Sequence, residues 1–358
     1  MLWNSDRRKT DAGLWVSMRL RRVVLLAALP LALGVGAARA ADCPGHPNAL
    51  GVSRTLVVDP HEHARIGTMS YAETLPLADH EVVLTFDDGP LPPYTDRVLA
   101  ILAANCIKAT YFIVGEMARA YPEAVRRVYA AGHTVGTHSW SHPMHFRAQT
   151  FERAKAQIDG GINATAAALG GADKVAPFFR FPGFGFTIPA ETYAASRGLM
   201  VWGADVPADD WTNISPKAIA ARAVRRLEAK GRGILLLHDI HERTVEALPI
   251  ILAELKSRGF RVVHVVPSRP DLPATVTAAA EWLPRGGDQP ELPVIRLAAI
   301  QQPDGERVMR ETPAQRCSLQ SRQYSKSRLA MRKRMRRAGI ASHDRDTTAS
   351  IRKIHAAQ

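Results

Sequence analysis

A repeated alternation of short apolar runs and amphipathic stretches, beginning near residue 80, constrains the fold of this chain more than any other feature. The apolar runs are rich in β-branched and aromatic residues, which indicates strands, and helical patterns fill the gaps between them. Strands this apolar, alternating with helices, indicate a parallel sheet covered by helices. The predicted strands are 82–86, 107–114, 133–137, 177–181, 199–204, 233–238 and 260–266, and the predicted helices include 95–105, 116–131, 150–169, 215–230 and 243–258.

The number of strands helps to decide between barrel and open-sheet architectures. Seven predicted strands favour an α/β fold, an irregular (β/α)7-type barrel with parallel strands, over the standard eight-stranded barrel. A doubly wound sheet is the other architecture with this alternation. In both, functional side chains gather beyond the carboxyl ends of the strands, so the polar motifs found there are the candidates for chemistry.

Three segments flank the region of alternating strands and helices. Residues 1–40 have the features of an export signal, with arginines before an apolar run of 14 residues and a final Ala-Arg-Ala, and Met18 is an alternative start. Because a membrane span needs about 20 residues, we expect no transmembrane span after signal removal. We expect an N-terminal extension over 41–79, a folded domain over 80–267, and a Pro/Ala-rich, then basic, disordered tail over 268–358.

Charge is concentrated at the two ends of the sequence. The net charge of +13 divides into +5 over residues 1–40, +9 over residues 301–358 and −1 between them. A nearly neutral core argues against nucleic-acid binding by the folded part. The basic tail has two interpretations, contact with anionic envelope polymers or an extension without a binding role.

The cysteines agree with export. A secreted or periplasmic chain can hold disulfides, and three cysteines would remain after removal of the signal. Cys43 and Cys106 are the favoured pair, because Cys317 lies in the predicted tail.

Two motifs that follow predicted strands indicate a metal site. "TFDDGP" places Asp87 and Asp88 after a strand, and two adjacent carboxylates resist burial without a cationic partner. "HTVGTHSWSHP" places His138 and His142 in a predicted loop, where two imidazoles can converge on a metal. Two histidines and one carboxylate describe a catalytic metal site, and the second carboxylate is then available as a general base.

Three further motifs add polar groups at other strand ends. "RFPG" supplies Arg180, which can orient a neighbouring carboxylate, and a turn whose backbone N–H groups can bind an oxyanion. "LLLHD" supplies His238, and "DVPADDW" supplies carboxylates that can hold an imidazole as a general acid.

Jointly and in this order, "TFDDGP", "HSWSH", "RFPG", "DVPADDW" and "LLLHD" resemble the five motifs of the polysaccharide deacetylase family, carbohydrate esterase family four. The resemblance covers about residues 80–267 and identifies them as the catalytic domain. It implies a distorted (β/α) barrel that removes acetyl groups from N-acetylglucosamine polymers or, in some members, from O-acetylated polysaccharides.

The resemblance also implies a role for each matching residue. Asp88, His138 and His142 would bind a divalent metal, zinc in the first place, with cobalt or another transition metal as alternatives. Asp87 would be the base that deprotonates the metal-bound water, and Arg180 would orient Asp87.

The remaining roles concern the leaving group and the substrate. His238 would protonate the leaving amine with Asp205 as its partner. Trp211 and Leu236 would line the pocket for the acetyl methyl group, and the backbone N–H near Gly183 would contact the oxyanion.

The sequence departs from the family pattern at two places. Gly183 stands where the third motif more often has an aromatic residue, which changes that side of the groove. The fourth motif is longer than Asp-x-x-Asp-Trp, so Asp205 and Asp209 are alternative partners of His238.

These observations predict a metal-dependent hydrolase that removes N-acetyl groups from a polysaccharide of the peptidoglycan or chitin type. Two alternatives stay open, a non-catalytic carbohydrate-binding protein of the cell envelope on the same fold and a hydrolase of a non-sugar amide.

Overall fold

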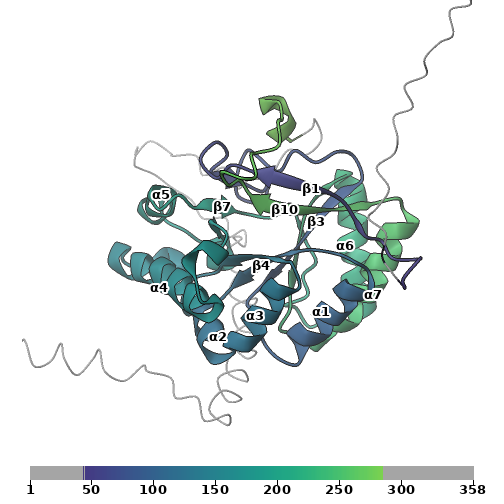
Figure 1. Ribbon diagram of the computed structural model, residues 1–358, viewed down its shortest axis with the longest axis horizontal. Helices are drawn as coiled ribbons and strands as arrows, with labels where there is room; N and C mark the ends of the chain where they lie inside the picture. Colours follow the sequence, from purple (N-terminus) through teal and green to yellow (C-terminus); the bar gives the residue numbers. More distant parts are fainter. Residues whose placement is uncertain (1–42, 44, 285–358) are drawn as a thin grey trace, which may run out of the picture. The chain divides into compact units, whose positions relative to one another are not determined.

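All ladder pairings among the named strands are parallel, as the alternation of strands and helices predicts. The computed structural model of the protein describes residue 43 and residues 45–284, and Figure 1 shows helices around the strands of this part. Ten strands form one sheet in the order β1-β10-β3-β4-β5-β6-β7-β2, with β9 beside β3 and β8 beside β9. The strands are β1 (Val52–Val58), β2 (Arg65–Ile66), β3 (Glu81–Asp87), β4 (Thr110–Ile113), β5 (Thr134–Thr137), β6 (Phe178–Phe179), β7 (Met200–Trp202), β8 (Val206–Pro207), β9 (Gly233–His238) and β10 (Arg261–Pro267).

The irregular α/β barrel is confirmed, although the sheet is not strictly closed. The segment from β7 to β8 pairs first with β6 and then with β9, and so connects two parts of the sheet. Residues 203–205 between these strands belong to no ladder. All seven predicted strands are present. Strands β1, β2 and β8 were not predicted, because β2 and β8 are only two residues long and the second to fourth residues of β1 are polar.

The helices follow the predicted pattern with one interruption. The predicted helix over 116–131 is divided into two, because Pro122 cannot continue a helix from the preceding turn and instead begins the next one. Helices α6 and α7 lie side by side, as do α2 and α4 (Figure 1). The helices are α1 (Tyr94–Ala104), α2 (Gly115–Ala120), α3 (Pro122–Ala130), α4 (Phe151–Leu169), α5 (Ile188–Ser196), α6 (Pro216–Lys230) and α7 (Glu242–Ser257). Among the described residues, no helix has the length and apolar character that crossing a bilayer requires.

Two apolar clusters lie on opposite faces of the sheet. Along β3, Val82, Leu84 and Phe86 belong to the cluster under the helices, whereas Val83 belongs to the cluster inside the barrel. Side chains alternate between the faces of a strand, so Thr85 and Asp87 point into the barrel as Val83 does. The alternation therefore places Asp87 at the inner face of the barrel, at the carboxyl end of β3.

The segments that flank the predicted domain are part of the fold. Strand β1, from the predicted N-terminal extension, pairs with β10 along its whole length. The disulfide between Cys43 and Cys106 is present and ties this segment to the end of α1. The prediction of a tail from residue 268 is wrong up to residue 284, because Trp282 is buried and stacks on His63 with ring centroids 3.5 Å apart. The predicted signal over residues 1–40, Cys317 and the basic tail lie outside the described residues.

Asp205 occupies the break in the sheet between β7 and β8. Its Oδ1 accepts hydrogen bonds from the backbone N–H and hydroxyl of Thr68 at 2.8 and 2.9 Å. Its Oδ2 accepts from the hydroxyl of Thr74 at 2.7 Å and from the backbone N–H of Ile234 at 2.8 Å. No ladder joins the segment after β2 to the start of β9, and the buried carboxylate of Asp205 connects them instead.

Replacement of Asp205 should destabilise the fold. Asp205→Ala leaves four buried donors without this acceptor, and hydrogen bonds to charged groups contribute about 1.5–3 kcal/mol each. We expect the free energy of unfolding to fall by at least about 3 kcal/mol, as measured by urea denaturation. Asp209→Ala is the matched control, because Asp209 forms half-exposed ion pairs with Arg222 and Arg226, which contribute about 0.2–1 kcal/mol. Equal stability of the two variants would contradict the bridging role.

Candidate metal and acid-base site

The carboxyl ends of four strands bring the candidate residues together. Asp87 ends β3 and His238 ends β9, and these two residues are direct partners in the parallel register of the strands. His138 follows β5, and Arg180 follows β6. Asp88 comes directly after β3 with a backbone φ of 75°, which turns its side chain away from the alternation of the strand.

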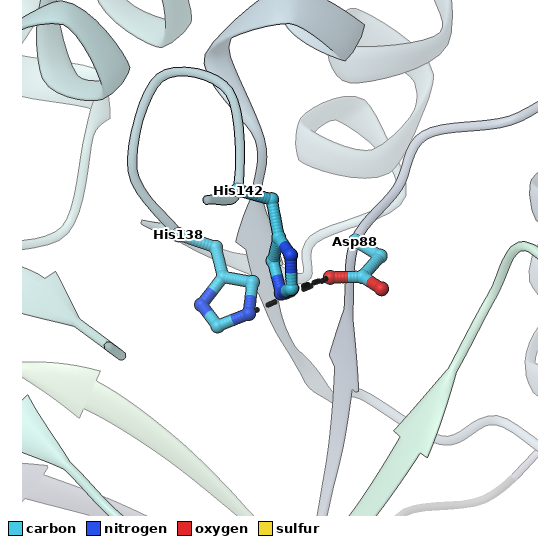
Figure 2. Close-up of side chains that lie close together, drawn as sticks. All are labelled: Asp88, His138 and His142. Carbon is cyan, nitrogen blue, oxygen red and sulfur yellow. Dashed lines mark ion pairs between the residues drawn. The ribbon is translucent and has the colours of Figure 1, made fainter. Parts of the chain in front are cut away.

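Asp88, His138 and His142 form a compact buried cluster (Figure 2). Oδ1 of Asp88 lies 3.5 Å from Nε2 of His138 and 3.2 Å from Nε2 of His142. One ligand atom from each residue lies within 4.8 Å of the other two, and all three residues are buried. Within the described residues this is the only group of three or more such side chains with a geometry that could hold a metal.

The donor set fits a zinc-type cation. His138 donates a hydrogen bond from Nδ1 to the backbone carbonyl of Arg180 at 2.6 Å. This contact leaves the lone pair of Nε2 directed toward Asp88 and His142, because a neutral imidazole carries its proton on only one nitrogen. Two imidazole nitrogens and one carboxylate are the ligands of catalytic zinc sites with open positions.

Arg180 and Asp87 form a buried ion pair next to this cluster. A terminal nitrogen of Arg180 donates to Oδ1 of Asp87 at 2.6 Å, and Oδ2 of Asp87 lies 3.7 Å from Nε2 of His138. Burial lowers the pKa of Arg180, and the charge of Asp87 opposes this change. One oxygen of Asp87 is therefore held by a cation, and the other faces the histidine cluster.

The remaining contacts of Arg180 fix its position inside the barrel. The guanidinium donates to the hydroxyl of Thr85 at 2.9 Å and to the carbonyl of Gly203 at 2.8 Å. It also lies over the ring of Phe112, 4.2 Å from the ring centroid. Neither Thr85 nor Gly203 was predicted as part of the site, because neither belongs to the motif that contains Arg180.

His238 is paired with Asp210 and not with either carboxylate that the sequence suggested. Nδ1 of His238 lies 2.8 Å from Oδ1 of Asp210, and the backbone N–H of His238 donates to Oδ2 at 2.8 Å. The hydroxyl of Thr244 also donates to Oδ2. Although burial opposes the charge on each group, their attraction lowers the pKa of Asp210 and raises that of His238 to about 9.

The assignments of Asp205 and Asp209 as the partner of His238 are corrected accordingly. The carboxylate of Asp205 is used by Thr68, Thr74 and Ile234 in the break of the sheet, and that of Asp209 by Arg222 and Arg226. The position directly before Trp211 was the available sequence signal for Asp210. The motif is two residues longer than Asp-x-x-Asp-Trp, which obscured this position.

The three predicted substrate-binding residues lie around the same mouth of the barrel. The ring of Trp211 meets that of His238 edge to face, with centroids 5.4 Å apart. Leu236 is buried in the inner cluster, and Trp211 packs against that cluster. Gly183 has a φ of 57°, and a Cβ atom at this position would have no atom within 4 Å.

Two more buried titratable groups, Asp239 and His241, lie beside His238. Neither was predicted from the sequence as part of the site. Burial raises the pKa of Asp239 to about 7, and its Oδ2 accepts from the hydroxyl of Thr95 at 2.6 Å. Burial lowers the pKa of His241 to about 4, and its ring centroid lies 6.2 Å from that of His238. Of the imidazoles of His238 and His241, that of His238 is the one whose surroundings favour the charged form.

Several known proteins are similar to this chain in sequence or in structure. The family model for polysaccharide deacetylase matches residues 75–202. The peptidoglycan-N-acetylmuramic acid deacetylase PdaC of Bacillus subtilis is 31% identical over 193 residues, covering 54% of this chain and 39% of that protein. A peptidoglycan-N-acetylglucosamine deacetylase of Bacillus cereus is 32% identical over 190 residues, covering 51% of this chain and 85% of that protein. The solved structure of the Bdellovibrio bacteriovorus peptidoglycan deacetylase Bd3279 matches with a TM-score of 0.54 and 34% identity, covering 61% of this chain and 60% of that chain.

The fold and the site together are those of a parallel α/β barrel that carries a buried Asp-His-His cluster at the carboxyl ends of its strands. The chain belongs to the polysaccharide deacetylase family. It spans less than half of the length of PdaC and most of the length of the Bacillus cereus relative.

The pairing of His238 with Asp210 can be tested by titration of the metal-free protein. We expect Asp210→Asn to lower the pKa of His238 from about 9, and Asp205→Asn and Asp209→Asn to leave it nearly unchanged. The measurement is the pH dependence of the histidine ring signals in nuclear magnetic resonance spectra. An unchanged pKa in Asp210→Asn would show that another group raises it.

The same pairing predicts a pH-dependent stability. Because the pKa of His238 is raised in the folded state, its contribution is complete below the unfolded value of 6.5 and is lost as the pH rises through about 9. The difference in free energy of unfolding between the unmutated protein and Asp210→Asn should therefore shrink between these pH values.

Proposed function

We propose that the protein is a metal-dependent hydrolase that removes N-acetyl groups from a polysaccharide containing N-acetylglucosamine, of the peptidoglycan or chitin type. The observation that carries the proposal is the buried cluster of Asp88, His138 and His142, with the ion pairs of Asp87 and of His238 beside it. Hydrolysis of the acetamide adds one water, and acetate and a free amine are the products.

Asp88, His138 and His142 would hold the metal, for which zinc is the proposed identity. When bound, a divalent cation in such a site lowers the pKa of water toward 7 and polarises the carbonyl oxygen of the substrate. The roles of the remaining residues follow from their own contacts.

Asp87 is the proposed general base. Its Oδ1 is held by Arg180, and its Oδ2 faces the cluster 3.7 Å from Nε2 of His138. The contact with Arg180 fixes the orientation of the other oxygen of Asp87, so that this oxygen can accept the proton of an attacking water. General bases of this kind contribute about 10²- to 10⁴-fold to the rate.

His238 is the proposed general acid. Its Nδ1 is bound to Asp210, so the proton that it can give to the leaving nitrogen is carried on Nε2. An amine is a poor leaving group until it is protonated, and a histidine held by a carboxylate is a suitable donor near neutral pH. Trp211, which contacts the ring of His238, is proposed to contact the acetyl group together with Leu236.

The surroundings of Gly183 support a role in binding the substrate. The turn that contains Gly183 begins two residues after Arg180, and the backbone N–H of Gly183 is proposed to bind the oxyanion. The space above Gly183 in this chain would accept a bulkier part of the polysaccharide than an aromatic side chain would permit.

A location outside the cytoplasm, secreted or periplasmic, is part of the proposal. The Cys43–Cys106 disulfide of the folded part supports an oxidising compartment.

The proposal can be tested by acetate release. The full-length protein, loaded with zinc or cobalt, should release acetate from peptidoglycan or chitin oligomers, and a chelator should abolish the release. Acetylated xylan and a small cyclic amide are the substrates for comparison. Release from neither glycan by the metal-loaded protein would contradict the proposal, and release from the cyclic amide alone would favour the non-sugar alternative.

Two neighbouring variants separate the base from the metal ligand. Asp87→Asn should lower turnover by at least about 10²-fold while the protein still binds metal. Asp88→Asn should lower the metal affinity itself, because it removes a proposed ligand. The checks are acetate release and a titration of metal against a coloured chelator. Turnover retained in Asp87→Asn would refute the assignment of the base.

A further inference from the structure

We infer that Gln157 and Gly161 of α4 are positioning residues that fix the loop between His138 and His142 and thereby set the metal affinity of the site. The inference rests on the proposed metal site. Neither residue touches the cluster of Asp88, His138 and His142, and both lie in a helix that the motifs do not include.

Gly161 permits a close approach of the loop to the helix. A Cβ atom on Gly161 would lie 2.8 Å from the backbone C and O atoms of Ser139, a distance that real Cβ contacts essentially never show. The atoms in the way belong to the main chain, so a change of rotamer cannot relieve the contact. Any side chain at this position would therefore push the loop away from α4.

Gln157, one turn earlier on α4, holds the next two residues of the loop. Its backbone carbonyl accepts from the N–H of Trp140 at 2.7 Å. Its side chain accepts from the N–H of Ser141 at 2.9 Å and donates to the hydroxyl of Ser141 at 3.0 Å. Together with Gly161, this residue determines the position of three consecutive loop residues.

The start of α2 holds the loop from another direction. The backbone N–H groups of Gly115 and Glu116 donate to the carbonyls of Ser139 and Trp140 at 2.9 and 2.8 Å. Ser139 has a φ of 66° and His142 a φ of 51°, conformations that non-glycine residues adopt only when their surroundings impose them. Contacts from two helices provide those surroundings.

The two histidines depend on these contacts unequally. His138 directly follows β5 and is also held by the carbonyl of Arg180. His142 lies at the far end of the loop, where its backbone N–H donates to the hydroxyl of Ser139 at 3.1 Å. A shift of the loop therefore moves His142 relative to His138, and metal–ligand distances in real sites stay within about 0.2 Å of their standard values.

Adjacent glycines of α4 provide a matched pair of variants. Gly161→Ala and Gly160→Ala both add a methyl group to the same helix and gain about 1 kcal/mol of helix propensity. The atom nearest to a Cβ on Gly160 is the side-chain Cβ of Trp140 at 3.1 Å, and no main-chain atom is among its nearest neighbours. Gly160→Ala therefore requires Trp140 to shift by a few tenths of an ångström, whereas Gly161→Ala overlaps directly with the backbone of Ser139 and requires a larger displacement of the loop.

The first experiment measures Co²⁺ binding to the full-length protein by competition with a coloured chelator, together with the visible absorption spectrum of bound Co²⁺. We expect Gly161→Ala to weaken binding by about 10- to 100-fold and to change the spectrum, as loss of supporting contacts does in other metal sites. Gly160→Ala should retain the affinity and spectrum of the unmutated protein. Equal affinities for the two variants would overturn the role of Gly161.

A second pair of variants tests Gln157 without adding bulk at the loop. Gln157→Met keeps the length of the side chain and removes both hydrogen bonds to Ser141, so Co²⁺ affinity should fall. Gln157→Glu keeps an acceptor for the N–H and hydroxyl of Ser141, and should restore the affinity. Equal affinity in Gln157→Met and the unmutated protein would overturn the role of Gln157.

Thermal unfolding of the metal-free variants distinguishes positioning from general stability. A purely structural role predicts a lower unfolding temperature with an unchanged Co²⁺ spectrum in the folded protein, and this result would overturn the inference. Failure of the unmutated protein to bind Co²⁺ would overturn the metal assignment as well. If the unmutated protein binds Co²⁺ and neither pair of variants changes that binding, only the inference about the positioning of the loop is overturned.

Discussion

The ion pair between Arg180 and Asp87 inside the barrel is the interaction on which both fold and site depend. Arg180 has no exposed surface, and an unpaired buried ion would cost roughly several kcal/mol. Asp87, Thr85 and the carbonyl of Gly203 accept hydrogen bonds from the two terminal nitrogens of the guanidinium, from two other parts of the sheet. The backbone carbonyl of the same arginine orients His138. One residue thus links the packing of the barrel interior to the geometry of the metal cluster.

The alternation of side chains along β3 and β9 explains why the chemistry lies at one mouth of the barrel. Outward residues such as Phe86 and Leu237 pack under the helices, and inward residues such as Val83 and Leu236 fill the barrel. The same period continues to the last residue of each strand. Asp87 and His238 therefore both end on the inner face, next to each other, and no special loop is required to bring base and acid together.

Most of the fold and much of the site could be predicted from the sequence because their signals are local. Apolar runs marked seven of the ten described strands, and short motifs marked Asp88, His138, His142 and Arg180. Partnerships between distant segments left no such signal. Which carboxylate contacts His238 depends on how the chain turns after β8. The motif "DVPADDW" contains Asp205, Asp209 and Asp210, and their positions in the sequence alone do not distinguish among them. The contacts of α4 with the loop between His138 and His142 could not be predicted for the same reason.

The break in the sheet at Asp205 gives this barrel a property that a continuous ladder excludes. Hydrogen-bonded strands keep a fixed spacing of about 4.8 Å, so the radius of a closed barrel follows from its strand number and stagger. Between β7 and β8 the ladder is replaced by separate contacts: the carboxylate of Asp205 binds Thr68, Thr74 and Ile234, and single backbone hydrogen bonds join Met69 to Ala204 and Asp205 to Ile234. The spacing of the walls at this break therefore depends in part on one side chain, and not on strand number and stagger alone.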